Sequence, residues 1–192
     1  MNIKPYYNYF KYVLEHKKNV FKTCWKRKLY LHAITHDLSK FSPKEFIPYA
    51  KYFYIDKDKY KDEFNKAWEH HYKNNPHHWD RWLDEKGVPQ VIPSKYLEQM
   101  IADWEGMSLK FGGSAQEYYL KNYRKIKLDR NTRMELEFML DINDSLAHNH
   151  GYTLEEFANN NSELQYAYYF EHIKSKYGVD SYNLLRNKEK GE

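Results

Sequence analysis

Histidine and aspartate side chains recur through the first 103 residues in an order that suits metal binding. They are His16, the pair His36-Asp37, the doublets His70-His71 and His77-His78, and Asp103. Imidazole nitrogens and carboxylate oxygens are ligands of divalent transition metals, and an adjacent His-Asp pair offers two ligands at once. Lys40 follows His36 by one helical turn and would add a cation on the same face. Two metal ions beside a lysine could attack a phosphate ester.

The His36-Asp37 pair suggests how two ions could share ligands. A carboxylate has two oxygens and can bridge two ions, whereas an imidazole nitrogen binds one. Asp37 is therefore the candidate bridge and catalytic carboxylate, and His36 is a terminal ligand. Asp103 lies between Ala102 and Trp104. Burying a carboxylate among apolar neighbours is costly unless a cation pairs with it, so Asp103 is a further candidate ligand.

The two histidine doublets lie in the densest part of the sequence, residues 68–79, where a tryptophan stands at each end. Asn74-Asn75-Pro76 is expected to break a helix between the doublets, because the residue before a proline disfavours helical backbone. One doublet would then end a helix, and the other would lie in the following loop or at the start of the next helix. One histidine of each doublet can face inward. The alternative interpretation is a surface cluster or a polar network between helices.

The elements that must position these residues are helices. Apolar residues recur with helical spacing, only seven glycines occur, and no stretch alternates with period two. Capping boxes mark four helix starts: Ser42–Glu45, Ser114–Glu117, Thr153–Glu156 and Ser162–Gln165. Helices are predicted over residues 5–22, 25–40, 57–73, 94–110 and 131–148. The pattern predicts an all-α, single-domain multi-helix bundle over 1–186, followed by a flexible polar tail over 187–192.

Composition narrows the functional classes. The 192 residues carry a net charge of only +4, so polymeric nucleic acid is an improbable partner despite the basic run between Lys17 and Lys28. The 20 tyrosines predict many half-buried rings at helix contacts. Cys24 is the single cysteine, which fits a reducing compartment. Neither a signal peptide nor an apolar run long enough to span a membrane is evident, so we expect a cytoplasmic protein.

The order of histidines and aspartates resembles that of the HD-domain superfamily of metal-dependent phosphohydrolases, in its longer form with extra histidines. His36–Lys40 is similar to the HDxxK signature of that superfamily. The chain also resembles a family of small bacterial and phage proteins, through HDLSKFSPKEF, HHYKNNPHHW and ADWEGMS at residues 36–46, 70–79 and 102–108. The resemblance covers about residues 7–140. It implies an HD-like helical bundle.

The resemblance also implies a ligand set. One metal would be bound by His16, His36, Asp37 and Asp103. The second would be bound by His70 and either His77 or His78, with Asp37 between the two ions. His71 remains ambiguous. His32 is a fallback, because the interval of 20 residues between His16 and His36 is short for many members. The Gly-Tyr-Pro motif of the cyclic-di-GMP phosphodiesterases is missing, which argues against that substrate.

The resemblance implies a phosphohydrolase that acts on a nucleotide or a related small phosphate ester with two divalent ions of Mn, Fe, Co, Ni or Zn. Lys40 would neutralise charge on the phosphate, and Arg133 is the further cation we single out for substrate binding. The substrate can be a monoester or a diester, and the sequence does not predict the number of subunits. One alternative is an HD-like di-iron oxygenase with the same ligands. Another is a non-catalytic helical binding or regulatory protein.

Overall fold

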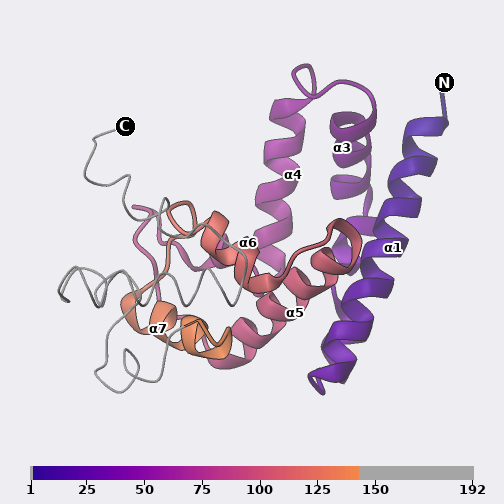
Figure 1. The fold of residues 1–192 in the computed structure, drawn as a ribbon. Helices are drawn as coiled ribbons and strands as arrows, with labels where there is room; N and C mark the ends of the chain where they lie inside the picture. The colour runs from indigo at the N-terminus through magenta and orange to yellow at the C-terminus, as the bar shows by residue number, and fades with distance from the viewer. Residues whose placement is uncertain (1, 143–192) are drawn as a thin grey trace. The chain divides into compact units, whose positions relative to one another are not determined.

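The described part of the chain folds as helices joined by turns and loops (Figure 1). The computed structural model describes residues 2–142 of the 192. This part contains seven α-helices, two short 3-10 helices (η1 and η2) and no strand, with a single isolated bridge between Leu83 and Pro89. The predicted all-α class is confirmed. Within the same range, no helix is both long and apolar enough to cross a membrane.

The helices follow one another closely along the chain. The α-helices are α1 (Lys4–Lys26), α2 (Tyr30–Thr35), α3 (Pro43–Tyr54), α4 (Lys61–Asn74), α5 (Ser94–Phe111), α6 (Ala115–Lys121) and α7 (Arg130–Met139). The 3-10 helices are η1 (Leu38–Phe41) and η2 (Trp79–Trp82). The predicted helix over 25–40 is wrong, because α1 continues to Lys26 and the chain then breaks twice before residue 40. The predicted helix over 131–148 is α7 as far as Met139 and is wrong for residues 140–142, which are not helical, whereas residues 143–148 lie outside the described part.

Two of the four predicted capping boxes can be compared with the structure. Ser114 caps α6 as expected, since its side chain accepts a hydrogen bond from the amide of Glu117 at 3.1 Å. The predicted helix start at Ser42-Pro43 is confirmed, since α3 begins at Pro43, but the Ser42 side chain makes no capping hydrogen bond, so the predicted capping box is wrong. The boxes predicted at 153–156 and 162–165 lie outside the described residues.

Helix α3 lies between α1 and α4 (Figure 1). These three helices share one apolar cluster, formed by Tyr9 and Val13 of α1, Tyr49 and Ala50 of α3, and Ala67 of α4. The buried side of α1 continues through His16 to Val20, because residues three or four apart share a helix face. The helix periodicity that buries Tyr9 and Val13 therefore also buries a histidine.

Helix α5 crosses α1 at a close approach. Val20 and Cys24 of α1 pack with Ala102 of α5, and Thr23 Oγ1 donates a hydrogen bond to the Ala102 carbonyl at 2.7 Å. A Cβ added at Gly106 would lie 2.6 Å from Val20 Cγ2, so only glycine fits there without a shift. Small residues on α5 therefore bring Asp103, which lies between Ala102 and Gly106, close to α1.

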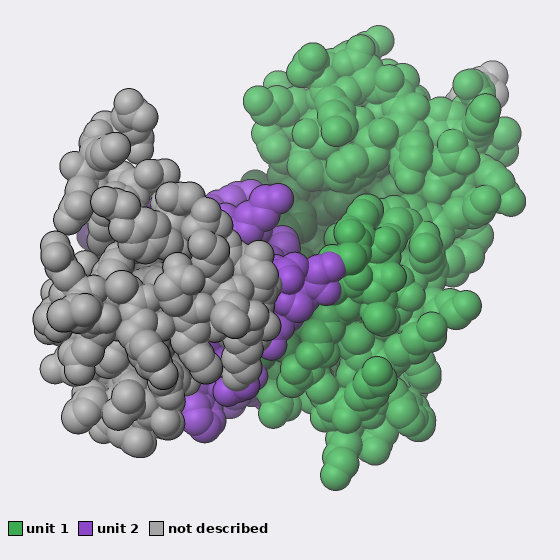
Figure 2. Space-filling view, in the orientation of Figure 1, with its two compact units in different colours: residues 1–82, 98–112 green, residues 83–97, 113–192 purple. Residues whose placement is uncertain are grey.

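The chain divides into two compact units (Figure 2). The first comprises residues 1–82 and 98–112, and the second comprises 83–97 and 113–192, of which 113–142 are described. All the candidate metal ligands belong to the first unit, whereas Arg133 belongs to the second. The predicted domain end at 186 and the predicted tail over 187–192 lie outside the described residues.

Candidate metal centre

The His36-Asp37 pair lies in a turn between helices. Helix α2 ends at Thr35, His36 is extended with φ −50° and ψ 125°, and Asp37 adopts the left-handed conformation with φ 55° and ψ 27°. Aspartate tolerates this conformation better than most residues. On the continuous helix that the sequence predicted, adjacent side chains would diverge by about 100°. The break instead turns both side chains to one point, where His36 Nε2 lies 3.3 Å from Asp37 Oδ2.

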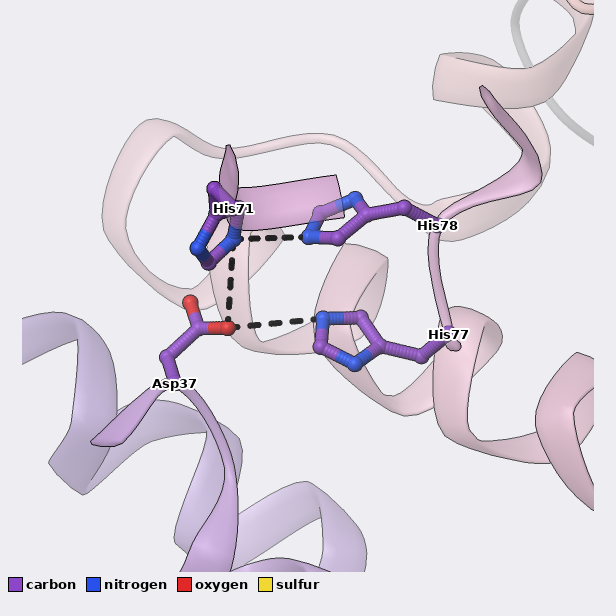
Figure 3. A group of neighbouring side chains, drawn as sticks. All are labelled: Asp37, His71, His77 and His78. Atoms are coloured by element: carbon purple, nitrogen blue, oxygen red, sulfur yellow. Dashed lines mark hydrogen bonds and ion pairs between the residues drawn. The ribbon is translucent and has the colours of Figure 1, made fainter. Parts of the chain in front are cut away.

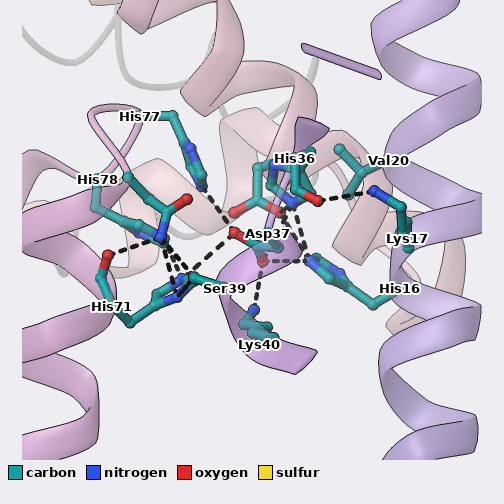
Figure 4. Close-up of polar contacts among 12 residues, drawn as sticks. His16, Lys17, Val20, His36, Asp37, Ser39, Lys40, His71, His77 and His78 are labelled. Carbon is teal, nitrogen blue, oxygen red and sulfur yellow. Dashed lines mark hydrogen bonds and ion pairs between the residues drawn. The ribbon is translucent and has the colours of Figure 1, made fainter. Parts of the chain in front are cut away.

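A first group of ligand atoms surrounds Asp37 Oδ2 (Figure 4). His16 Nε2 lies 3.2 Å from Asp37 Oδ2 and 3.2 Å from His36 Nε2. Asp103 Oδ1 lies 3.4 Å from His16 Nε2 and 3.5 Å from His36 Nε2. Ligands bound to one ion at about 2.1 Å lie about 3.0–3.4 Å from their neighbours in octahedral or tetrahedral geometry. The ligand atoms of His16, His36 and Asp103 therefore have the spacing of a coordination shell, and Asp37 Oδ2 lies next to the two histidine nitrogens.

A second group faces the other carboxylate oxygen of Asp37 (Figure 3). Asp37 Oδ1 lies 3.4 Å from His71 Nε2 and 3.5 Å from His77 Nε2. His78 Nε2 completes the group, 2.9 Å from His71 Nε2. Asp37 thus presents one oxygen to each of two ligand groups, which is the arrangement of a bridging carboxylate.

Buried atoms without a hydrogen-bond partner test whether metal ions fit these residues. Asp37 Oδ1, His77 Nε2 and Asp103 Oδ1 are buried, and none of them forms a hydrogen bond. Such orphaned polar atoms cost about 1–3 kcal/mol each, more when charged, and are rare in native proteins. Two are carboxylate oxygens and one is an imidazole nitrogen, all of which bind transition metals. The residues therefore fit two divalent ions, one in each group.

The protonation states of Asp37, His77 and His78 suit metal binding, whereas the His36 ring would have to release a proton to bind an ion. Burial opposes charge on Asp37, but His36, Lys40 and His71 outweigh it and hold the pKa of Asp37 well below its usual range. Burial lowers the pKa values of His77 and His78, which keeps both rings neutral, the form that coordinates metals. For His36 the opposing carboxylates of Asp37 and Asp103 prevail over burial and raise the pKa to about 9.

Lys40 is the cation closest to the bridging carboxylate. Its Nζ lies 2.5 Å from Asp37 Oδ2, and its side chain is 13% exposed. Burial disfavours a charged lysine, yet the carboxylates of Asp37 and Asp103 outweigh that effect and raise the pKa of Lys40. Lys40 is therefore a charged ammonium group at the edge of the first ligand group. It lies in the short helix η1, and not on the same face of a continuous helix as His36, as the sequence predicted.

Glu45 explains the different positions of the two histidines in the first doublet. Its carboxylate is fully buried, with Oε2 2.8 Å from His71 Nδ1 and Oε1 2.7 Å from His70 Nδ1. Ser39 Oγ donates a further hydrogen bond to Oε2 at 3.0 Å. His71 Nε2 is thereby directed at Asp37, whereas the side chain of His70 is 36% exposed and lies outside the ligand groups. The structure thus brings His71, and not the predicted His70, to the centre.

The second doublet reaches the centre from a loop, as predicted. Helix α4 ends at Asn74, and Asn75 Nδ2 donates to the His71 carbonyl at 2.7 Å and to Ser39 Oγ at 3.0 Å. Trp82 Nε1 donates to the Pro76 carbonyl at 2.9 Å and so fastens the other side of the loop. These bonds hold the loop so that both histidines of the second doublet, rather than one, join the ligand group.

His32 contacts the first ligand group through the Nδ1 atom of His36. Its Nε2 lies 3.2 Å from His36 Nδ1, so the His36 ring is held with Nε2 toward Asp37. His32 also forms a third possible ligand group with His36 and His77. Burial lowers the pKa of His32 to about 4, which leaves its ring neutral. His32 can therefore position the His36 ring, and it is also a candidate ligand in the third group.

Arg133, predicted to bind substrate, is engaged inside the second unit. Its Nη1 donates to the Tyr119 hydroxyl at 2.8 Å, and its Nη2 donates to the Ile126 carbonyl at 2.6 Å. The guanidinium also lies 4.4 Å from the ring centroid of Tyr123. These contacts account for Arg133 as a structural residue and give no support to a role in binding substrate.

Comparisons with known proteins leave the chemistry open. No curated protein and no solved structure is similar enough to the chain to count as a match. Residues 6–148 match a family model described as "Family of unknown function (DUF5662)". That match covers most of the chain, including every residue of the two ligand groups. The chain therefore belongs to the family of unknown function DUF5662.

Proposed function

We propose that this protein is a metal-dependent hydrolase of small phosphate esters with a dinuclear centre. The observation that carries the proposal is the carboxylate of Asp37, whose two oxygens face two separate groups of ligand atoms. A structural zinc site is mononuclear and is closed by four protein ligands. Two groups that share one carboxylate are instead typical of dinuclear sites that act on phosphates.

The two ions would be held by different parts of the first unit. His16, His36 and Asp103 would hold one, and His71, His77 and His78 the other, with Asp37 shared. When bound, such ions activate water and polarise phosphoryl oxygens. Glu45 and His32 would hold His71 and His36 in the orientation that metal binding requires, as carboxylate and other polar partners commonly do for metal-bound histidines.

Lys40 supports the choice of phosphate as the reacting group. It is a charged ammonium group next to the bridging carboxylate, and its side chain is partly exposed. A cation in this position would pair with a phosphoryl oxygen and stabilise charge that develops during hydrolysis. A small phosphate ester such as a nucleotide is the substrate class that these features favour.

Metal content and hydrolysis measured together test the proposal. Protein purified without an affinity tag should contain about two equivalents of a transition metal by mass spectrometry, and should hydrolyse p-nitrophenyl phosphate or its bis ester. Asp37→Ala should lose both the metal and at least about a thousandfold in turnover, because both ligand groups lose their shared member. Asp62→Ala, an exposed aspartate on α4 of the same unit, is the matched control and should retain both. Circular dichroism should show equal helix content.

Three results would contradict the proposal. Protein that takes up no metal on titration would leave the cluster as a polar network. An Asp37→Ala variant with full turnover would remove the centre from the chemistry. Two bound irons with oxygen consumption and no anaerobic hydrolysis would assign the same ligands to an oxygenase, because affinity alone does not select the metal.

A further inference from the structure

Helix α1 has a second apolar face in addition to the one that it buries in the first unit. Large apolar side chains with 39–75% of their surface exposed follow it from end to end: Ile3, Tyr7, Phe10, Leu14, Phe21 and Trp25. At about 100° per residue they fall within about 60° of the helix circumference, away from the buried stripe of Tyr9, Val13 and Val20. We call these six residues the α1 seam.

The α1 seam has the spacing of a coiled-coil helix. Successive members are separated by four, three, four, seven and four residues, which follows a heptad repeat from Ile3 to Phe21 with one position missing. Trp25 lies one residue beyond the next heptad position, which is the buried Cys24. The missing position is Lys17, whose Nζ donates to the carbonyl oxygens of Ile34 at 2.7 Å and His36 at 3.0 Å. Lys17 is therefore occupied in holding the end of α2. The exposed apolar surface continues from the α1 seam onto α2, since the ring centroids of Trp25 and Tyr30 lie 4.7 Å apart.

Positive charge runs along one side of the α1 seam. Lys4, Lys11, Lys18 and Lys22 are exposed and fall within about 40° of one another on the adjoining face. None of the four forms an ion pair with a carboxylate among residues 2–142. Glu15, the one acidic residue of α1, pairs with Lys110 of α5. The charge beside the seam is thus positive and uncompensated.

We propose that the α1 seam is a docking site for an amphipathic helix of a partner protein whose flanks carry aspartate or glutamate. The spacing from Ile3 to Phe21 favours a helical partner, and the lysines favour acidic flanks, as charges beside a coiled-coil seam do. A second copy of this chain fits less well, because antiparallel pairing about a twofold axis would bring the same lysines against one another. From Ile3 to Trp25 the seam extends about 33 Å, enough for about three heptads of the partner.

Fluorescence anisotropy with two synthetic helices tests this proposal. Both are fluorescein-labelled peptides of four heptads with leucine at the seam positions. One carries glutamate in the flanking positions and the other carries lysine. The full chain should bind the glutamate peptide at least tenfold more tightly. Its affinity should fall with increasing salt, because exposed charges contribute.

Variants of the full chain identify the surface. Leu14→Glu should weaken binding of the glutamate peptide at least tenfold. The triple variant Lys11→Glu, Lys18→Glu and Lys22→Glu should reverse the preference to the lysine peptide. Lys44→Glu, an exposed lysine at the start of α3, is the matched control and should change affinity less than twofold. All these side chains are exposed, and equal helix content by circular dichroism shows that the variants fold.

The proposal is overturned if the two peptides bind equally, or if Leu14→Glu leaves binding of the glutamate peptide unchanged. It is also overturned if light scattering shows a dimer that Leu14→Glu dissociates, which would assign the seam to a second copy. Binding to vesicles of phosphatidylserine and phosphatidylcholine that requires Leu14, without discrimination between the peptides, would assign it to an anionic membrane surface.

Discussion

Two buried polar clusters of the described residues are built in opposite ways. In the second unit, the Tyr119 hydroxyl donates to Glu137 Oε1 at 2.7 Å and accepts from Arg133 Nη1 at 2.8 Å. Each of these donors meets an acceptor. In the first unit, by contrast, carboxylate oxygens of Asp37 and Asp103 converge with imidazole nitrogens, and several of these atoms form no hydrogen bond.

The difference shows what distinguishes a binding centre from a structural network. Both clusters are buried and both contain ionisable groups, so burial and charge alone do not separate them. In the second unit, complementary donors and acceptors satisfy one another. In the first unit, carboxylate oxygens and imidazole nitrogens converge, and all of these atoms bind cations. A bound cation would give the buried atoms the partner that they lack. Matched substitutions in the two clusters test whether they differ in this way.

Removing one carboxylate from each cluster should give the largest contrast. Asp103→Ala should weaken binding of one ion by about a hundred- to a thousandfold, since a four-ligand metal site binds with about 10–16 kcal/mol in total. Glu137→Gln should leave metal affinity unchanged within twofold. Competition with a chromophoric chelator measures both affinities. Equal losses of metal in the two variants would abolish the distinction between the clusters.

The next largest effect is expected at Arg133, and it should be on stability. Arg133→Met should lower the free energy of unfolding by about 2–4 kcal/mol, because Glu137 and Tyr119 lose a buried cationic partner. Urea denaturation measures this change, and Arg124→Met, an exposed arginine of the same unit, is the matched control. Metal content and KM should not change. A tenfold rise in KM at unaltered stability would instead support the predicted role in binding substrate.

Glu45→Gln should act on one ligand group and spare the other. An amide has one acceptor oxygen, so it cannot accept from His70 and His71 together as the carboxylate does. We expect the affinity for the ion held by His71 to fall about 10–100-fold, and the other ion to bind as before. Titration with cobalt(II), followed by visible absorption, resolves the two equivalents. Glu63→Gln, on the exposed side of α4, controls for loss of a surface carboxylate; equal behaviour of the two variants would remove Glu45 from the centre.

The smallest effect is expected from Gly106→Ala. The added Cβ would meet Val20 Cγ2 at 2.6 Å, and overpacking of this kind costs about 1–3 kcal/mol, partly offset by about 1 kcal/mol of helix propensity. The thermal midpoint should therefore fall by a few degrees. Combining the change with Val20→Ala should recover part of the loss, because the two residues are in contact. Strictly additive effects would show that α5 does not approach α1 as closely at this point.

Local sequence signals predicted part of the structure well. The helical class, the break at Asn75-Pro76 and the cap at Ser114 follow from periodicity, proline sterics and side-chain hydrogen bonding, which act over a few residues. The turn at Asp37 could not be predicted in this way, because the spacing of His32, His36 and Lys40 is equally that of a continuous helix. The sequence predicts Glu45 as a capping residue, because Ser42 and Pro43 precede it as that motif requires. In the structure its partners are instead His70 and His71, which lie 25 and 26 residues further along the chain.

The amino-acid sequence alone was enough to predict the helical class and the kinds of atoms that a centre could use. It placed imidazoles and carboxylates where helical periodicity could bury them, as it does for His16 beside Val13 and Val20. The tertiary structure alone decided that His71 rather than His70 faces Asp37, and that Asp37 turns through a left-handed residue. The physical reason is that sequence fixes the angle between neighbouring side chains on a helix, whereas the direction in which that helix faces is set by packing against other helices.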